Sequence, residues 1–327
     1  MNQHYQVSLI IPIYNVENYV ADALNSALNQ TFISIEYVLV DDCGTDNSMD
    51  IVHNIVEKSS RKNDVYIYRH EVNCGLSAAR NSGVEKATGR YVFFMDSDDV
   101  ISQNCIELHY NALIENNADF TTGFVRMEGS RSLHVKYKNY GVLRGKDVLC
   151  HYLQRELPES ANNKLISLDF IKRNNIDFIP GLLHEDVLWA LTMCRNASVA
   201  VCVPHQTYHY KIRPNSITSS RCSEKRLNSL KYILNELLKQ RTEIVKTKKE
   251  LYLYNKFVSR WQFVFALLLT TSDNNYNQKR EWYRNVVQKN NNCNTKYSFI
   301  MNLPFGVFSF CFHVPYLIYR RIQKIYH

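Results

Sequence analysis

Residues 91–99 read Tyr-Val-Phe-Phe-Met-Asp-Ser-Asp-Asp, an apolar run that ends in three carboxylates within four residues. The apolar part predicts a buried strand, and the acidic part follows at its carboxyl end. Carboxylates this close repel one another unless a cation or hydrogen-bond donors compensate their charge. Such hard oxygen ligands suit Mg²⁺ or Mn²⁺, and the alternative is an acidic turn that caps the following helix.

The same alternation of strand and helix extends toward the N-terminus. Apolar runs at 7–11, 35–40 and 65–68 predict three more strands, and a helical pattern follows each of them, the last over 76–87. Continuous apolar strands that alternate with helices indicate a parallel sheet covered on both faces. Ligands bind such sheets beyond the carboxyl ends of the strands, so the polar residues after strands one, two and four are the candidates for a site.

Beyond residue 120 the pattern is less regular. The segments that we expect there are strands at 120–127, 133–137 and 199–203 and helices at 146–154, 164–174 and 185–195. We also expect a linker at 272–277 and a loop at 290–294. We therefore expect an α/β domain over 1–220, with a Rossmann-like, mostly parallel sheet and helices on both faces. A basic helical C-terminal region follows over 221–327.

The charge is divided unevenly along the chain, whose total is +8. Residues 1–120 contain 7 Lys and Arg against 17 Asp and Glu, a balance of −10, and the remainder carries +18. An acidic first part suits a cation site, and a basic second part suits an anionic surface such as a membrane. The alternative is ordinary solvated surface charge.

Composition and missing motifs exclude several classes of protein. With 45% hydrophobic and 21% charged residues, the chain has the composition of a folded protein. Nine cysteines without a C-x-x-C pair argue against a zinc ribbon or a disulfide framework and fit a reducing cytoplasm. We find no signal peptide and no run of about eighteen apolar residues, so we expect a cytoplasmic protein. The glycine-rich phosphate motifs of dinucleotide enzymes and P-loop ATPases are missing.

Polar residues follow the first two predicted strands and open the third helix. Tyr14 suits stacking on a base, and the pair Asp41 and Asp42 suits hydrogen bonds from ribose or base. Both positions also have a structural interpretation, as a loop aromatic and as a turn. Gly75 opens a helix whose N-terminus favours an anion, and Arg80 suits either a phosphate or one of the acids.

Two later motifs carry groups for acid–base and metal chemistry. Glu185 and Asp186 stand at the start of a predicted helix, where the helix dipole stabilises them, and the functional alternative is a carboxylate base. Residues 208–216 contain His209, a candidate metal ligand, and Arg213, a candidate diphosphate clamp. A single histidine is more often structural than a ligand.

Taken together, five motifs resemble those of glycosyltransferase family 2. In the family's order and spacing they are Val-Ser-Leu-Ile-Ile-Pro-Ile-Tyr-Asn at 7–15, Val-Asp-Asp-Cys-Gly-Thr-Asp-Asn-Ser at 40–48, Gly-Leu-Ser-Ala-Ala-Arg-Asn-Ser-Gly at 75–83, Asp-Ser-Asp-Asp at 96–99 and His-Glu-Asp at 184–186. The resemblance covers about residues 5–220 and implies a GT-A fold, a nucleotide-sugar donor, commonly UDP-linked, a divalent metal and inversion at the anomeric carbon. Cys43 stands where the family often has glycine.

The resemblance also implies roles for individual residues. The residues that it places around the nucleotide-sugar are Pro12, Tyr14, Glu17, Asp41, Asp42, Arg80, Asp96, Ser97 and Arg213. Asp98, with His209, binds the Mg²⁺ or Mn²⁺ that bridges the diphosphate. Asp186 is the general base, and Glu185 orients it or touches the acceptor.

The expected function is therefore an inverting transfer of sugar from a nucleotide-diphosphate donor, with UDP favoured, to a hydroxyl of a glycan or lipid-linked glycan. Residues 1–120 form the nucleotide-sugar half of the catalytic domain, and residues 121–220 form its acceptor half.

The main alternative is a non-catalytic nucleotide-sugar-binding or scaffold protein of the same fold. A nucleotidyltransferase would need a glycine-rich basic loop after the first strand. A nucleic-acid binder would need aromatics interleaved along a basic strip, so we expect no nucleic-acid partner.

The C-terminal segment 299–325 combines an apolar, aromatic block with basic residues at its end. Pro304 and Pro315 oppose one straight spanning helix, because proline costs about 3 kcal/mol inside a helix. Aromatics beside basic residues suit a segment at a membrane interface, which predicts peripheral contact with the inner face of the cell membrane. The alternative is a C-terminal helix that packs on the catalytic domain.

Overall fold

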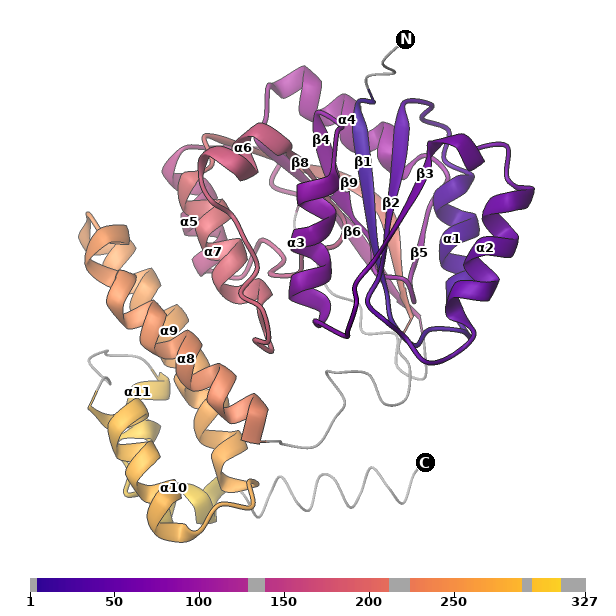
Figure 1. Ribbon diagram of the computed structural model, residues 1–327. Coiled ribbons are helices and arrows are strands. Elements are labelled where there is room, and N and C mark those ends of the chain that lie inside the picture. The colour runs from indigo at the N-terminus through magenta and orange to yellow at the C-terminus, as the bar shows by residue number, and fades with distance from the viewer. Residues whose placement is uncertain (1–4, 129–138, 212–223, 290–295, 313–327) are drawn as a thin grey trace. The chain divides into compact units, whose positions relative to one another are not determined.

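The computed structural model describes residues 5–128, 139–211, 224–289 and 296–312, and the structural statements below concern these residues. The chain divides into two compact units, Met1–Ser216 and Ile217–His327 (Figure 1). The predicted strand at 133–137, the predicted loop at 290–294 and Arg213 lie outside the described residues.

The first unit is built on a sheet whose N-terminal strands are parallel. β1 (Val7–Ile13) pairs with β2 (Ile35–Asp41) on one side and with β4 (Tyr91–Phe94) on the other, and β3 (Val65–Arg69) pairs with β2. All seven residues of β1 are buried. Alternate side chains of a strand point to opposite faces, so a strand that is apolar throughout needs cover on both faces.

Helices supply that cover on the two faces of the sheet (Figure 1). Val7, Leu9, Ile11 and Ile13 join a core that includes apolar residues of α1 (Val20–Leu28), α2 (Ser48–Lys58) and α4 (Cys105–Asn116). On the opposite face, α3 (Leu76–Lys86) packs against β1 and β2. A Cβ added at Gly83 would lie 2.3 Å from the Cγ2 of Ile10, so glycine is what allows this close approach of helix and strand.

Beyond β4 the sheet becomes mixed. Its order continues β4-β8-β6-β9-β5, with β7 on β9, and the pairs β4–β8, β6–β8, β5–β9 and β7–β9 are antiparallel while β6–β9 is parallel. The bounds of these strands are β5 (Val100–Ile101), β6 (Phe120–Glu128), β7 (Val142–Arg144), β8 (Lys164–Ser167) and β9 (Val199–Lys211). The remaining elements of this unit are η1 (Lys62–Asp64), α5 (Lys146–Leu153), α6 (Leu168–Arg173) and α7 (Asp186–Asn196). This α/β architecture, a sheet with helices on both faces, agrees with the fold class expected from the sequence.

Two sequence expectations in this region are wrong in detail. The predicted helix over 164–174 begins only at Leu168, because residues 164–167 form β8 between β4 and β6. Lys164 lies in that buried strand with 1% of its surface exposed, and its Nζ donates to the backbone carbonyl of Ser160. The predicted strand 199–203 is also too short, since β9 runs to Lys211 and brings the candidate His209 into the sheet.

The second unit is helical. It consists of α8 (Glu224–Ile244), α9 (Lys248–Thr270), α10 (Tyr276–Trp282), a π-helical turn η2 (Tyr283–Gln288), α11 (Lys296–Met301) and a helical segment over 305–312. α8 and α9 pack together, and the buried hydroxyl of Tyr254 donates to the Leu237 carbonyl across their contact, at 2.6 Å. A capping box begins α9, where Thr247 and Glu250 exchange hydrogen bonds with each other's backbone.

The aromatics of the predicted membrane segment divide between the core and the surface. Phe305 and Phe308 are buried and contact the ring of Tyr283, whereas Phe299 and Phe310 are 78% and 75% exposed. Residues 313–325 of the segment lie outside the described part of the chain. In that described part, no helix combines the length and the apolar character needed to cross a bilayer.

Candidate active site

Arg80 is the centre of an ion-pair cluster that joins two of the motifs. Its side chain is 3% exposed, and one terminal nitrogen, Nη2, donates to Asp96 Oδ1 at 2.9 Å. The other, Nη1, donates to Glu185 Oε1 at 2.9 Å and to Asp186 Oδ1 at 3.3 Å. α3 thereby connects the acidic end of β4 to the start of α7, 105 residues away. Of the two roles that the sequence leaves open for Arg80, the structure shows the one in which it holds acids.

The protonation states in this cluster follow from burial and charge. Burial lowers the pKa of Arg80, but the carboxylates of Asp96, Asp186 and Glu185 outweigh that effect and raise the pKa, so the guanidinium stays charged. Burial raises the pKa of Asp186 to about 7, because Arg80 only partly opposes it while the charges of Glu185 and Asp96 add to it. A carboxyl with a pKa near 7 suits proton transfer at neutral pH.

Asp96 is fixed by two side chains to which the sequence analysis assigns no role. Asn162 Nδ2 donates to Asp96 Oδ2 at 2.9 Å, and the backbone N–H of Asp96 donates to the buried hydroxyl of Tyr208 at 3.0 Å. Both oxygens of Asp96 therefore have donors, one from Arg80 and one from Asn162. Asn162 stands just before β8 in a stretch without a motif. Tyr208 lies on β9, but the strand predicted from sequence ends at residue 203, so the sequence does not place Tyr208 in the sheet.

A buried polar network contains Asn163 and Thr207, the sequence neighbours of Asn162 and Tyr208. His109 contacts Thr121 Oγ1 at 2.8 Å and Asn163 Oδ1 at 3.1 Å, and Thr207 Oγ1 donates to Asn163 Oδ1 at 2.8 Å. Burial lowers the pKa of His109 to about 3, so the imidazole is neutral. Asn163 has a left-handed φ of 56°, and these contacts hold it there. The network fixes the chain on which Asn162 and Tyr208 stand.

The remaining acids of the motif lie in the turn between β4 and β5. Burial raises the pKa of Asp99 to about 8, the charges of Asp96 and Asp98 add to that rise, and the N–H of Lys211 opposes it by donating to Asp99 Oδ1 at 3.0 Å. Ser97 is buried. The β5–β9 ladder pairs Val100 with His209, which places His209 beside this turn.

Asp98 and His209 are chemically suited to a divalent cation. Carboxylate oxygen and imidazole nitrogen are ligands of Mn²⁺, and the carboxylate also suits Mg²⁺. The charge of Asp98 is one of the causes that raise the pKa of Asp99, and a cation bound to Asp98 would offset that charge. The donor set therefore fits the metal that the sequence motif indicates.

A second group of potential metal ligands is engaged in hydrogen bonds instead. Among the described residues, Asp42, His70 and Cys74 bring ligand atoms within 4.8 Å of one another. His70 uses Nδ1 on Asp42 at 2.7 Å and Nε2 on Ser82 at 2.9 Å. The Asp42 carboxylate also accepts the backbone N–H groups of Cys74 and Gly75, both at 2.8 Å. Asp42 thus holds the loop that precedes α3.

The loops after β1 and β2 hold each other in place. Asn15 Oδ1 accepts from the N–H of Thr45 at 2.8 Å, and Glu17 Oε2 accepts from the backbone and the side chain of Asn47, both at 3.1 Å. Pro12 is buried in β1, while Tyr14 is 46% exposed and available to a ligand.

The second loop begins with a constrained turn. Asp41 Oδ1 accepts from the N–H of Cys43 at 3.0 Å, and its Oδ2 lies 3.4 Å from Arg69 Nε. Cys43 has a φ of 57°, in the left-handed region where glycine carries no steric penalty. This backbone conformation explains why a glycine often occupies the position in proteins that share the motif.

The structure therefore brings the predicted residues together in two places. Arg80, Asp96, Glu185 and Asp186 form one contact cluster, with Asp98 and His209 beside it in the turn and on β9. Tyr14 and Glu17 belong to the loop that follows β1, and Asp41 is the last residue of β2.

Comparison with known proteins gives the family and the fold. The family model described as "Glycosyl transferase family 2" matches residues 8–163. An uncharacterized glycosyltransferase of Haemophilus influenzae is 32% identical over 221 residues, which are 66% of this chain and 82% of the relative. TuaG of Bacillus subtilis, a putative teichuronic acid biosynthesis glycosyltransferase, is 38% identical over 122 residues, 37% of this chain and 47% of the relative.

A solved structure matches both units of the chain. The crystal structure of S. aureus TarS 1–349 in complex with UDP-GlcNAc has a TM-score of 0.71 and 20% sequence identity, and the match covers 97% of this chain and 92% of that one. At this identity the likeness concerns the fold. With the sequence matches and the five motifs in place on this fold, the chain belongs to glycosyltransferase family 2.

Proposed function

We propose that the protein is an inverting glycosyltransferase that moves a sugar from a UDP-linked donor to a hydroxyl of a glycan or lipid-linked glycan. The observation that carries the proposal is the cluster in which Arg80 holds Asp96, Glu185 and Asp186 together. It supports a site in which a donor-binding acid and a base of suitable pKa lie on opposite sides of one guanidinium.

The reaction that we infer is a single displacement. The acceptor hydroxyl oxygen attacks the anomeric carbon as its proton passes to a carboxylate oxygen of Asp186. The bond between that carbon and the diphosphate oxygen breaks, and its electron pair leaves with the nucleotide. General-base assistance of this kind contributes about a hundredfold to ten-thousandfold in rate. Attack from the face opposite the leaving group inverts the anomeric centre.

Arg80, Glu185 and the metal-binding residues have supporting roles in this mechanism. Arg80 holds Asp186 and keeps the pKa of that carboxyl from rising further. Glu185 shares the same guanidinium nitrogen and orients Asp186 or meets the acceptor. A bound Mg²⁺ or Mn²⁺ supplies neutralisation of the charge on the leaving diphosphate, and Asp98 and His209 are the residues that would hold it.

The substrate classes rest on the comparisons. The TarS structure contains UDP-GlcNAc, which supports a UDP-sugar as the donor and a hexosyl or N-acetylhexosaminyl group as the sugar. TuaG is named for teichuronic acid biosynthesis, which supports a polysaccharide acceptor. Exposed Phe299 and Phe310, together with the net charge of +18 beyond residue 120, support peripheral membrane contact in the cytoplasm, where a lipid-linked acceptor would be met.

A thermal-shift panel tests this function. UDP, GDP, CDP and dTDP are each added with Mn²⁺ or with a chelator, to the wild type and to Asp98→Ala. UDP with Mn²⁺ should raise the melting temperature of the wild type, since a ligand at a hundred times its Kd adds about 2.7 kcal/mol. Chelator or Asp98→Ala should remove that rise, whereas Glu85→Ala, on an exposed position of α3, should keep it.

Other outcomes would redirect or reject the proposal. A rise with GDP in place of UDP would overturn the choice of donor. The absence of a rise with every nucleotide would reject the donor site itself. Binding of UDP without any transfer or donor hydrolysis would favour the alternative of a non-catalytic nucleotide-sugar-binding protein.

A further inference from the structure

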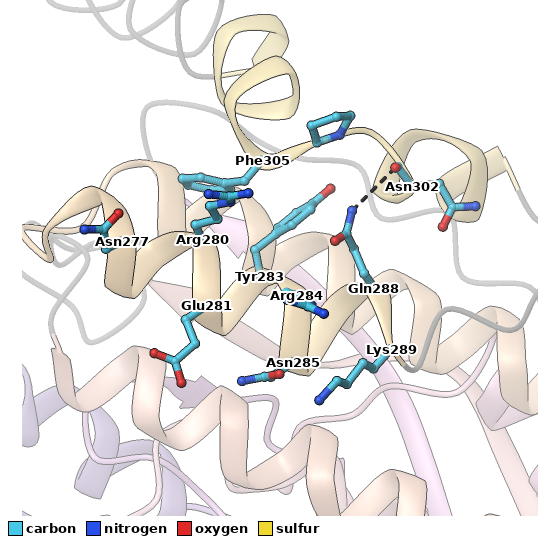
Figure 2. Close-up of a pocket in the computed structure, with 11 residues that line it drawn as sticks. Asn277, Arg280, Glu281, Tyr283, Arg284, Asn285, Gln288, Lys289, Asn302 and Phe305 are labelled. Carbon is cyan, nitrogen blue, oxygen red and sulfur yellow. Dashed lines mark hydrogen bonds between the residues drawn. The ribbon is translucent and has the colours of Figure 1, made fainter.

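The second unit contains a cavity of about 800 Å³ that none of the motifs involves (Figure 2). The residues that line it come from α10, from η2 with Lys289 after it, and from the segment 302–305. Its volume lies in the range of about 300 to 1,000 Å³ that is usual for ligand sites.

The wall of the cavity is firmly built. The buried hydroxyl of Tyr283 donates to the Met301 carbonyl at 2.9 Å, and Gln288 Nε2 donates to the Leu303 carbonyl at 3.1 Å. The Tyr283 ring also contacts the ring of Phe305, with centroids 5.3 Å apart. These contacts tie η2 to the segment 301–305, so the two sides of the cavity are fixed relative to each other.

The backbone of one side is unusual. η2 is a π-helical turn that follows α10 directly, and such turns occur within helices frequently at functional sites. The wider turn carries Tyr283, Arg284 and Gln288. In Figure 2, Arg280 and Gln288 point toward the segment with Phe305 and Asn302, whereas Glu281 points away from it.

The charged groups of the cavity lining are mostly positive. Arg280, Arg284 and Lys289 are exposed, and none of them forms an ion pair with a residue in the described part of the chain. Glu281 is the single acid among the lining residues. Guanidinium groups bind phosphate and carboxylate by paired hydrogen bonds, so the lining favours an anion.

The uncharged lining residues narrow the class of ligand. Side-chain amides line the cavity at Asn277, Asn285, Gln288 and Asn302, and groups of this kind bind hydroxyls. Gln288 Nε2 already donates to the Leu303 carbonyl, so a ligand hydroxyl would meet its Oε1. The rings of Tyr283 and Phe305 are buried, 1% and 5% exposed, so they offer no free face on which a nucleic-acid base could stack. Cations with amides and without a stacking platform suit an acidic chain rich in hydroxyl groups.

We propose that this cavity binds an anionic saccharide or polyol chain, through phosphate or carboxylate groups on Arg280 and Arg284 and through hydroxyl groups on the amides. The inference rests on the proposed function, because it makes the cavity a site for the acceptor chain of that reaction. A site of this kind would hold the acceptor polymer at a position other than the reacting hydroxyl.

Fluorescence anisotropy with the full chain tests the proposal. The probes are labelled octamers of glycerol phosphate and of a polyuronate, with a neutral glucan octamer for comparison. We expect one of the two anionic octamers to bind more tightly than the glucan. Arg280→Gln/Arg284→Gln should weaken that binding about tenfold or more, because it removes the two guanidinium groups that would bind the anions.

The control variant is matched in charge to the cavity variant. Lys248→Gln/Lys249→Gln removes two exposed positive charges from the same unit away from the cavity, and it should change binding less than twofold. Equal weakening by both double variants, or no binding of either anionic octamer, would overturn the proposal. Tighter binding of labelled oligo-dT would assign the cavity to nucleic acid instead.

Two further measurements separate this cavity from a lipid site and from the nucleotide site. Suppose that the octamers do not bind, and that phosphatidylglycerol vesicles bind the wild type but not Arg280→Gln/Arg284→Gln. That result would assign the cavity to lipid headgroups and overturn the saccharide ligand. The UDP and Mn²⁺ thermal shift is measured on the same double variant and should be unchanged. If the wild type shows no thermal shift with UDP and Mn²⁺, the proposed function is rejected. If it shows that shift but binds neither anionic octamer, only the saccharide site in the cavity is rejected.

Discussion

Asp186 has two properties that a single substitution separates, its place in the Arg80 cluster and its capacity to take a proton. Asp186→Asn keeps the size of the side chain and an oxygen that can accept from Arg80. We expect this variant to lose sugar transfer by about a hundredfold or more, because general-base assistance contributes at least that much. The thermal shift with UDP and Mn²⁺ should persist. Loss of donor affinity in Asp186→Asn would count against the assignment of Asp186 as the base.

The raised pKa of Asp186 also predicts a dependence on pH. The base must be ionised, so the rate of transfer should rise as the pH increases through about 7. The effect on stability has the opposite sign. A carboxyl whose pKa is raised on folding adds stability below its unfolded pKa of about 3.9, and that stability is lost as the pH rises through about 7.

Melting temperatures between pH 5 and pH 9 measure the stability effect without a substrate. The wild type should lose several degrees over this range relative to Asp186→Asn, which has no proton to release. Parallel curves for the two proteins would show that the Asp186 carboxyl does not titrate in this range.

Asn162 acts on the site through Asp96, so we regard it as a positioning residue. Asn162→Ala removes the donor at 2.9 Å from Asp96 Oδ2, and we expect weaker donor binding, seen as a higher KM, with little change in melting temperature. Asn162→Asp should be worse, because it places a like charge beside Asp96. Equal kinetics for the wild type and both variants would remove Asn162 from the site, and a large loss of melting temperature in Asn162→Ala would make its role structural.

At the scale of elements, the packing of α3 on β1 decides where Arg80 lies. Gly83→Ala would place a Cβ 2.3 Å from Ile10 Cγ2, and overpacking of this kind costs about 1 to 3 kcal/mol. Alanine is the better helix former by about 1 kcal/mol, which offsets only part of that cost. We therefore expect the clash to prevail and the melting temperature to fall. Glu85→Ala, on the same helix but exposed, serves as the control. A melting temperature that rises in Gly83→Ala would show that α3 can shift away from the sheet.

The elements also show which parts of the structure local sequence could predict. The apolar strands β1, β2 and β4 and the acids that follow them are continuous in sequence, whereas the sequence leaves open whether Arg80 meets a phosphate or one of those acids. β8 could not be predicted in this way. Lys164 begins a stretch of helical pattern, and only its place between β4 and β6 makes it a buried strand residue whose pKa falls to about 8 because of burial.

The same limit applies to the supporting residues of the site. Asn162 and Tyr208 lie 66 and 112 residues from Asp96 along the chain, and the antiparallel pairing that brings them there has no local signature. The η2 turn is similar, because no motif in the sequence marks a π-helical turn at 283–288. Sequence alone predicts a site residue when one continuous segment shows both its chemical type and its place at the end of a strand.

At the scale of the whole chain, the surplus of positive charge beyond residue 120 and the two exposed phenylalanines predict binding to anionic membranes. The full chain should sediment with phosphatidylglycerol vesicles and less with phosphatidylcholine vesicles, because basic residues near an anionic surface contribute about 1 kcal/mol each. Phe299→Ser/Phe310→Ser should weaken sedimentation about tenfold or more, since burial of a phenylalanine side chain contributes about 1.5 to 3 kcal/mol. Tyr252→Ser, at a position 57% exposed on α9, is the control for loss of an exposed aromatic and should bind as the wild type does. Equal binding by the phenylalanine variant and the wild type would show that charge alone attracts the protein to the vesicles. If the wild type does not sediment, the membrane proposal is rejected, and the proposed active site is not affected.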